Sequence, residues 1–173
     1  MSTDGINFID RALAQGDALT PDDFLQAMAD IYKEPQVWRE LDRYPQYIQD
    51  VIYIIDYDTE VQMEGLDACA VSSYAEQYIQ ALLNCGAVAE AEILKRAREL
   101  SLSAPDYEDT AVDAEMETLH RQTALNRDYE GFWNLVRRYI KRSNAQKEMN
   151  GHAESHPHRP PQAGAAGVPH PGC

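Results

Sequence analysis

Residues 47–61 read YIQDVIYIIDYDTEV, the most apolar segment of the chain. Pro45 precedes this segment, and no turn-forming residue interrupts it. Its length favours a helix over a buried strand, although near-continuous hydrophobicity is compatible with both. The sequence therefore predicts that this segment forms the central helix of the domain.

Helix-start and helix-stop signals recur on both sides of the central segment. The motif TPDD at residues 20–23 supplies an N-cap, a proline at the first helical position and two acids, and predicts a helix through about Lys33. Ser73 and Glu76 form a capping-box pattern, and Gly86 suits the position just after a helix end. Further helices are expected over residues 87–100, 105–120 and 128–141.

The composition changes sharply near Glu148. Residues 148–173 are rich in Pro, Gly, Ala and His, and such a segment buries too little apolar surface to offset the entropy of ordering it. No β-hairpin signal is present in the preceding part. The sequence thus predicts an all-α single domain of six to seven helices over residues 1–147, followed by a disordered tail, 148–173.

The charge of the chain is distributed unevenly. The protein carries 29 acidic and 15 basic residues, a net charge of −14. Residues up to Leu94 include eighteen acids and four bases, so this half accounts for the whole net charge, and Tyr44 to Leu94 contains no Lys or Arg. Such a field repels nucleic acids and anionic membranes and attracts basic protein surfaces. We therefore expect a basic protein partner, no nucleic acid and no membrane.

The C-terminal part of the domain has the opposite charge. From Arg121 to Lys147 there are seven basic and two acidic residues. A nucleic-acid surface would use such residues, but here they alternate with an apolar stripe over barely one helix. The pattern favours a solvated helix face whose cations stabilise the helix C-terminus.

Two sets of carboxylates recur at helical spacing. At 100° per residue the first set lies on the side of the central helix opposite its apolar residues, although Gly65 can end the helix before the last member. A separation of four residues rises about 6 Å, comparable with the distance between phosphates along a nucleic-acid strand. A solvated acidic face that serves solubility would show the same pattern. The candidate partner-binding residues are Asp56, Glu60, Glu64 and Asp67 in the first set, and Asp109, Asp113 and Glu117 in the second.

Asp58 differs from these carboxylates because it projects toward the apolar side of the central helix. An unpaired carboxylate is costly there. We expect Asp58 to have a structural role, paired with an arginine or with the N-terminus of another helix.

No catalytic, cofactor or metal site is expected. The chain lacks a G-x-S-x-G motif and a glycine-rich phosphate loop, and His120 is the only histidine before the tail. Glu117 and His120 form one E-x-x-H motif, whereas a di-iron bundle requires two. Cys69 and Cys85 lie in acidic or apolar surroundings that raise a thiol pKa. The tail's His152, His156, His158, His170 and Cys173 could hold zinc or nickel only weakly, because no fold fixes their geometry.

The cellular location follows from the cysteines and from the N-terminus. Three widely spaced cysteines do not form a disulfide framework, which fits a reducing compartment. The chain begins MSTDG, without the features of a signal peptide, and no apolar segment approaches the roughly 18 residues of a membrane span. We expect a cytoplasmic protein.

A family resemblance rests on residues 58–97, DTEVQMEGLDACAVSSYAEQYIQALLNCGAVAEAEILKRA, and on the ending LNRDYEGFWNLVRRYIKRS at 125–143. This pattern resembles a family of small bacterial all-α proteins named after DNA mimic protein 19, over roughly residues 45–142. The matching positions are Glu60-Val61, Gly65-Leu66, Cys85-Gly86-Ala87 and the segment 91–94. The chain departs from the family in the central turn, where Met63, Glu64 and Leu66 replace Asn, Gly and Phe, and Ala68-Cys69-Ala70 replaces Gln-Phe-Phe.

The resemblance implies an all-α fold and a role in which an acidic dimer occupies the DNA-binding surface of a basic protein. A homodimer is therefore compatible with the resemblance, and the partner would be a transcription factor or a nucleoid protein. An immunity or antitoxin-like protein that neutralises a basic toxin would rely on the same electrostatics. A small-ligand protein or an enzyme is a third hypothesis, and it requires a concave pocket with convergent polar groups.

Overall fold

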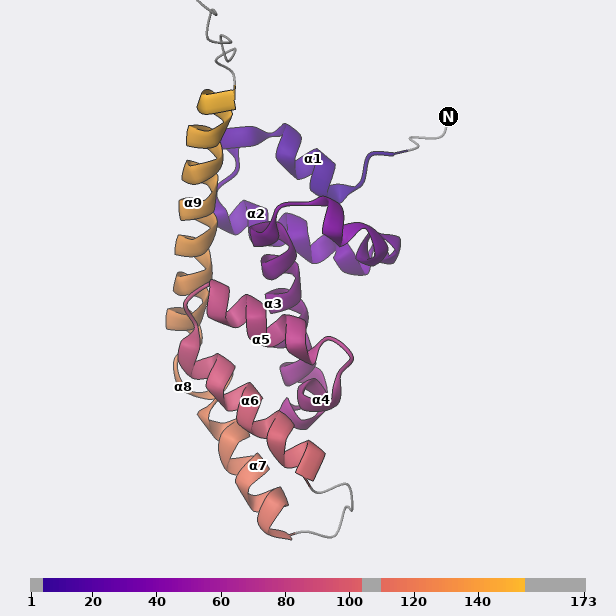
Figure 1. Ribbon diagram of the computed structural model, residues 1–173, viewed down its shortest axis with the longest axis vertical. Helices are drawn as coiled ribbons and strands as arrows, with labels where there is room; N and C mark the ends of the chain where they lie inside the picture. Colours follow the sequence, from indigo (N-terminus) through magenta and orange to yellow (C-terminus); the bar gives the residue numbers. More distant parts are fainter. Residues whose placement is uncertain (1–4, 104–109, 155–173) are drawn as a thin grey trace, which may run out of the picture.

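The apolar segment forms helix α3, Gln46–Met63, in the computed structural model, which describes residues 5–103 and 110–154. Pro45, which precedes the apolar segment in the sequence, is the N-cap residue of α3. Apolar side chains of α3 such as Ile48, Ile52 and Ile54 are fully buried. The helix runs through the middle of the molecule, and the other helices pack around it (Figure 1).

Helices precede and follow α3 with short connections. Before it lie α1 (Phe8–Ala14), the 3₁₀ helix η1 (Gly16–Ala18), α2 (Pro21–Met28), and the 3₁₀ helices η2 (Ala29–Tyr32) and η3 (Pro35–Arg43). After it lie α4 (Leu66–Val71), α5 (Ala75–Asn84), α6 (Val88–Ser103), α7 (Thr110–Gln122), α8 (Ala124–Arg127) and α9 (Tyr129–Glu154). The described ranges contain no strand, so the prediction of an all-α fold is confirmed. The sequence did not predict the short helices α1, α4 and α8, because so few turns show little hydrophobic periodicity.

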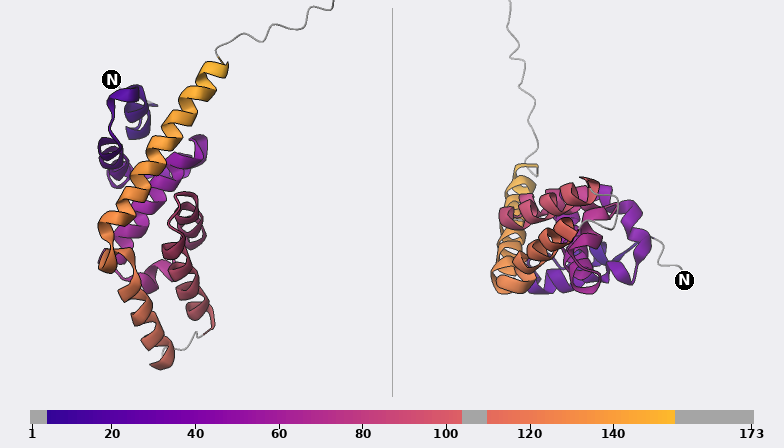
Figure 2. Two further views of the ribbon diagram at one scale, coloured as in Figure 1. Left: turned by 90° about the vertical axis from the view of Figure 1, so that its left-hand side faces the viewer. Right: turned by 90° about the horizontal axis from the view of Figure 1, so that it is seen from below.

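The helices are arranged along the length of the molecule. Helix α9 runs along one side, where it contacts α2 and α3, and α5 packs on α3 and α6 (Figures 1 and 2). Helices α1 and α2 lie toward one end, and α7 lies at the other end against α4, α6 and α8. No helix within the described residues is long and apolar enough to cross a membrane.

Two of the predicted helix ends are confirmed by their hydrogen bonds. The Thr20 hydroxyl accepts from the Asp23 backbone N–H at 3.1 Å, and the Asp23 carboxylate accepts from the Thr20 N–H, which completes a capping box. Gly86 follows α5 with φ +90°, a conformation that costs glycine little. The Ala87 N–H then donates to the Leu82 carbonyl at 2.9 Å and closes the helix end.

The predicted start of α5 is wrong. Ser73 and Glu76 do not form a capping box, because the N-cap residue is Tyr74 and its side chain makes no cap hydrogen bond. The Ser72 hydroxyl instead accepts from the Tyr74 N–H at 3.1 Å, a local turn that competes with a serine cap.

The boundaries of the last helices also differ from expectation. Helix α9 continues past the predicted end at Lys141 to Glu154, beyond the expected start of the tail at 148. Helix α7 is described from Thr110, and the predicted opening at residues 105–109 lies outside the described residues, as do residues 155–173.

Polar side chains connect α3 to the helices around it. Asp50 is 1% exposed and accepts hydrogen bonds from the Tyr139 hydroxyl on α9 at 2.6 Å and from the Asn84 amide on α5 at 3.0 Å. The Tyr57 hydroxyl donates to the buried Glu90 carboxylate on α6 at 2.6 Å. None of the ion pairs between described residues involves these two carboxylates. The buried charges are therefore stabilised by hydrogen bonds from neutral donors.

Asp56 on α3 shows the same arrangement. It is 9% exposed and accepts from the Tyr32 hydroxyl at 2.7 Å and from the Tyr78 hydroxyl on α5. Burial raises the pKa of both tyrosines, as do their contacts with Asp56, so both remain neutral donors at physiological pH. No buried side-chain nitrogen or oxygen among the described residues lacks a hydrogen bond.

Replacing Tyr78 by Phe is expected to lower the free energy of unfolding by about 1.5–3 kcal/mol, because Asp56 then loses a hydroxyl donor while staying buried. The matched control is Tyr74→Phe, in the same aromatic cluster, whose hydroxyl has no hydrogen bond among the described residues. That change should alter stability by about 0.5 kcal/mol or less. Urea unfolding of both variants measures the difference, and equal losses would contradict the role assigned to the Tyr78 hydroxyl.

Candidate functional site

Gly65 separates the carboxylates at the end of α3 from Asp67 on α4. Gly65 has φ +96°, a conformation that side chains rarely adopt, and a Cβ there would lie 2.8 Å from Asp67 Oδ1. Helix α3 therefore ends at Met63, and Asp67 lies in the first turn of α4. The possibility that the helix stops before Asp67, raised by the sequence, is confirmed.

Asp56 does not lie on an exposed face of α3, and its expected position there is wrong. Its carboxylate is buried and engaged by two tyrosine hydroxyls, as described above. The 100° periodicity places Asp56 opposite Tyr47, but α3 is surrounded by other helices on that side too. Asp56 thus stabilises the packing of η2 and α5 on α3, and a partner cannot reach it.

The other three members of the first set are accessible. Glu60 is partly buried, and Glu64 and Asp67 are exposed. None of them forms an ion pair or a side-chain hydrogen bond with another described residue. Their charges are therefore available to another molecule.

Helix α7 contributes the second set beside α4. Asp113 and Glu117 are exposed, and Glu117 pairs with Arg121 one turn later. Asp109 lies outside the described residues. Helix α7 packs on α4, and His120 Nδ1 accepts from the Leu66 N–H at 3.4 Å. His120 therefore accepts a hydrogen bond at the start of α4 and connects α7, which carries the second set of carboxylates, to α4, which carries Asp67.

We call these accessible carboxylates the acidic surface. It comes from three elements, α3, α4 and α7, of which α4 contacts both of the others. Its members are Glu60, Glu64, Asp67, Asp113 and Glu117.

Asp58 has hydrogen-bond partners within the fold, as a structural role requires, but they are not the partners that the sequence predicted. It accepts from the Tyr129 hydroxyl on α9 at 2.8 Å and from the Gln62 amide at 2.7 Å, rather than from an arginine or a helix N-terminus. Burial raises the pKa of Asp58, while these hydrogen bonds act in the opposite direction.

Glu90, like Asp50, is a buried carboxylate whose setting was not predicted from the sequence. Its second oxygen accepts from the Ala124 N–H at 2.8 Å, so it joins α6 both to Tyr57 and to the start of α8. Burial raises the pKa of Glu90, partly offset by these two hydrogen bonds. A usable signal was the excess of tyrosine, ten residues against three phenylalanines, since tyrosine supplies a hydroxyl donor within an apolar setting.

Among the described side chains, Cys69, Cys85, Glu117 and His120 were the candidates for nucleophilic or metal chemistry. Burial raises the pKa of the Cys69 thiol to about 12 and that of Cys85 to about 11, as the sequence indicated, so neither is an activated nucleophile. Glu117 and His120 are engaged with Arg121 and Leu66, respectively. The described residues contain no group of three or more ligands arranged to hold a metal ion.

An open groove of about 510 Å³ lies between α6, α8 and α9. Its walls are largely small or apolar, including Ala87, Val88 and Ile93. Glu90 lines it, but both carboxylate oxygens are already hydrogen-bonded. Glu90 therefore has no free oxygen to offer a ligand there, and the other polar residues of the lining are Gln122, Arg127 and Asp128.

Several bases of the C-terminal segment have partners within the chain. Arg137 pairs with Asp22 at 2.7 Å and with Glu130 at 3.3 Å. The Arg142 guanidinium lies 5.6 Å from the centre of the Tyr139 ring. These contacts favour the interpretation of this stretch as a structural helix face over a nucleic-acid surface.

Comparison with known proteins gives one match. A family model described as DMP19-like protein matches residues 42–146, which include the whole acidic surface. No curated protein and no solved structure matches the chain significantly.

Mild acid is expected to stabilise the protein. Burial raises the pKa of Glu90 and of Asp58 in the folded state, so their contribution to stability is complete below the unfolded pKa and is lost as the pH rises through the folded value. The free energy of unfolding should therefore increase when the pH is lowered from about 7 to about 5.

Glu90→Gln removes one of these titrating groups and should reduce the increase. Glu92→Gln, an exposed change on the same helix, controls for net charge. Urea unfolding at about pH 7 and about pH 5 gives, for each variant, the increase in the free energy of unfolding between the two pH values. Because only this increase is compared, a lower overall stability of one variant does not affect the result. An unchanged increment in Glu90→Gln would contradict the assignment.

Proposed function

Because the chain belongs to the DMP19-like protein family, we propose that it is a non-enzymatic protein-interaction module that occupies the basic DNA-binding surface of another protein. The acidic surface is the proposed contact region. Its partner would be a transcription factor or a nucleoid protein, and it would act in the cytoplasm with its buried cysteines reduced.

The observation that supports this proposal is that four of the five carboxylates of the acidic surface have no cationic partner among the described residues, Glu117 with Arg121 being the exception. Glu60, Glu64, Asp67 and Asp113 form no ion pair with any described residue. Among acids elsewhere in the protein, Glu92 pairs with Lys95, Glu99 and Glu115 pair with Arg96, and Glu76 pairs with Arg98, whereas the exposed Asp17 and Asp42 pair with no described residue.

The geometry of the surface also suits a protein that normally binds DNA. Glu60 and Glu64 are one turn apart, about 6 Å along α3, close to the spacing of phosphates on a strand. Negative groups held on packed helices lose little freedom when they meet lysine and arginine side chains. Such charges speed association and make it dependent on salt.

The triple change Glu60→Gln, Glu64→Gln and Asp67→Asn tests the proposal. It removes three charges, keeps size and polarity, and should leave the fold intact, because none of the three side chains is buried. The matched control is Asp42→Asn, Glu92→Gln and Glu99→Gln, three exposed residues outside the acidic surface with the same change in net charge.

Each protein is immobilised and exposed to the heparin-binding fraction of the native cell lysate at about 0.05–0.3 M salt. The unaltered chain and the control should retain basic DNA-binding proteins and release them to added duplex DNA. The triple variant should retain at least about fivefold less. If the triple variant retains as much protein as the unaltered chain, the acidic surface is not the contact region. Capture of a basic toxin would favour the hypothesis of an immunity protein.

The chain itself is expected not to bind nucleic acid. Its net charge of −14 opposes association with any polyanion, so fluorescence anisotropy with a random duplex at about 0.15 M salt should show no complex. Measurable affinity for the duplex would contradict the proposed function, and the basic residues of 121–147 would then be the candidate binding surface.

A further inference from the structure

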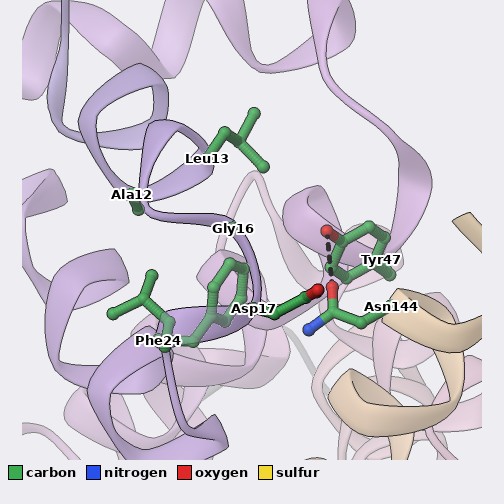
Figure 3. A pocket seen from close by; sticks show the side chains of 8 residues that line it. Ala12, Leu13, Gly16, Asp17, Phe24, Tyr47 and Asn144 are labelled. Atoms are coloured by element: carbon green, nitrogen blue, oxygen red, sulfur yellow. Dashed lines mark hydrogen bonds between the residues drawn. The ribbon is translucent and has the colours of Figure 1, made fainter. Parts of the chain in front are cut away.

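A cavity of about 220 Å³ lies far from the acidic surface, among α1, η1, α2, the start of α3 and α9 (Figure 3). Leu13, Leu19 and Phe24 give it apolar walls. Tyr47 and Asn144 close its inner side, and Asp17 stands beside them.

The aromatic part of the wall is held rigidly. The rings of Phe24 and Tyr47 are stacked with centroids 6.0 Å apart, and both side chains are buried. The Tyr47 hydroxyl donates to Asn144 Oδ1 at 3.1 Å, which fixes the amide. Burial raises the pKa of Tyr47, so the hydroxyl keeps its proton at neutral pH.

Asp17 places a negative charge at the cavity. Asp17 lines the same cavity as Asn144 and Tyr47 (Figure 3). Asp17 is exposed and forms no ion pair or hydrogen bond through its side chain with another described residue. An entering cation would therefore meet an unsatisfied carboxylate next to an aromatic wall.

The size and chemistry of the cavity indicate one kind of occupant. Small-molecule pockets typically enclose about 300–1,000 Å³, so this cavity is better matched to a single side chain. An arginine has an apolar stem for the leucine and phenylalanine walls, and its planar guanidinium can approach an aromatic ring while binding a carboxylate. The oxygens of Asp17 and Asn144 can accept its N–H donors.

We propose that this cavity receives an arginine side chain of the basic partner protein. The nature of that partner rests on the function proposed above, whereas the cavity itself does not. Tyr47 and Glu60 are thirteen residues apart on α3, about 20 Å. At 100° per residue, Tyr47 and Glu60 project from different sides of α3, so the cavity is tested independently of the acidic surface.

The test is a titration of the isotope-labelled protein with N-acetyl-arginine amide to about 50 mM, followed by NMR. The side-chain amide of Asn144 and the backbone amides of Gly16 and Asp17 should shift along a saturable curve. N-acetyl-citrulline amide has nearly the same shape without the charge, and N-acetyl-leucine amide is apolar. Both should bind at least about threefold more weakly.

Asp17→Asn should weaken arginine binding about two- to fivefold, because it removes only the charge from an exposed position. The control Asp42→Asn, an exposed carboxylate without a described partner, should leave binding unchanged. No shift at these amides, equal shifts with citrulline, or no effect of Asp17→Asn would overturn the proposal. If basic proteins are captured but the titration gives no chemical-shift changes, only the proposal for the cavity is rejected. If the chemical shifts change but no basic protein is captured, only the proposal for the acidic surface is rejected.

Discussion

Burial of carboxylates without cationic partners is the constraint on which this fold depends. Asp50 and Asp56 on α3 and Glu90 on α6 are all at least 91% buried. Burying an isolated charge is prohibitive, but several directed hydrogen bonds offset much of that cost. Tyrosine hydroxyls from η2, α3, α5 and α9 supply these bonds.

These hydrogen bonds connect packing with specificity. Apolar contacts alone would allow helices to slide or rotate against α3 with little loss, because the hydrophobic effect is non-directional. A hydroxyl that must reach one carboxylate oxygen restricts both movements. Asp50 orients α5 and α9 in this way, and Glu90 orients α8 through its first backbone N–H. The rigid arrangement that results also holds the exposed carboxylates of α3, α4 and α7 in fixed relative positions.

The protein therefore uses its acids in two different ways. Some are interior and satisfied by neutral donors, and they contribute to the architecture. Others, such as Glu64 and Asp113, remain exposed without a cation among the described residues, and they form the contact region that we propose. Family membership, this surface and the cavity beside Asp17 are consistent with recognition of a basic protein, in which charge brings the partner close and the cavity selects one side chain.

The sequence by itself determined the all-α class, the central helix, the capping of α2 by Thr20, the helix end at Gly86 and the acidity of the first half. These features depend on local propensity, on hydrophobic periodicity and on counted charge, all of which can be read along the chain. Only the tertiary structure decided which carboxylates are buried. Asp56 and Glu60 share a spacing and a helix side, yet two tyrosines from η2 and α5, 24 and 22 residues distant in the chain, cover Asp56, while no described side chain pairs with Glu60. Periodicity specifies the direction in which a side chain points from its own helix, whereas burial depends on which other helices pack against it.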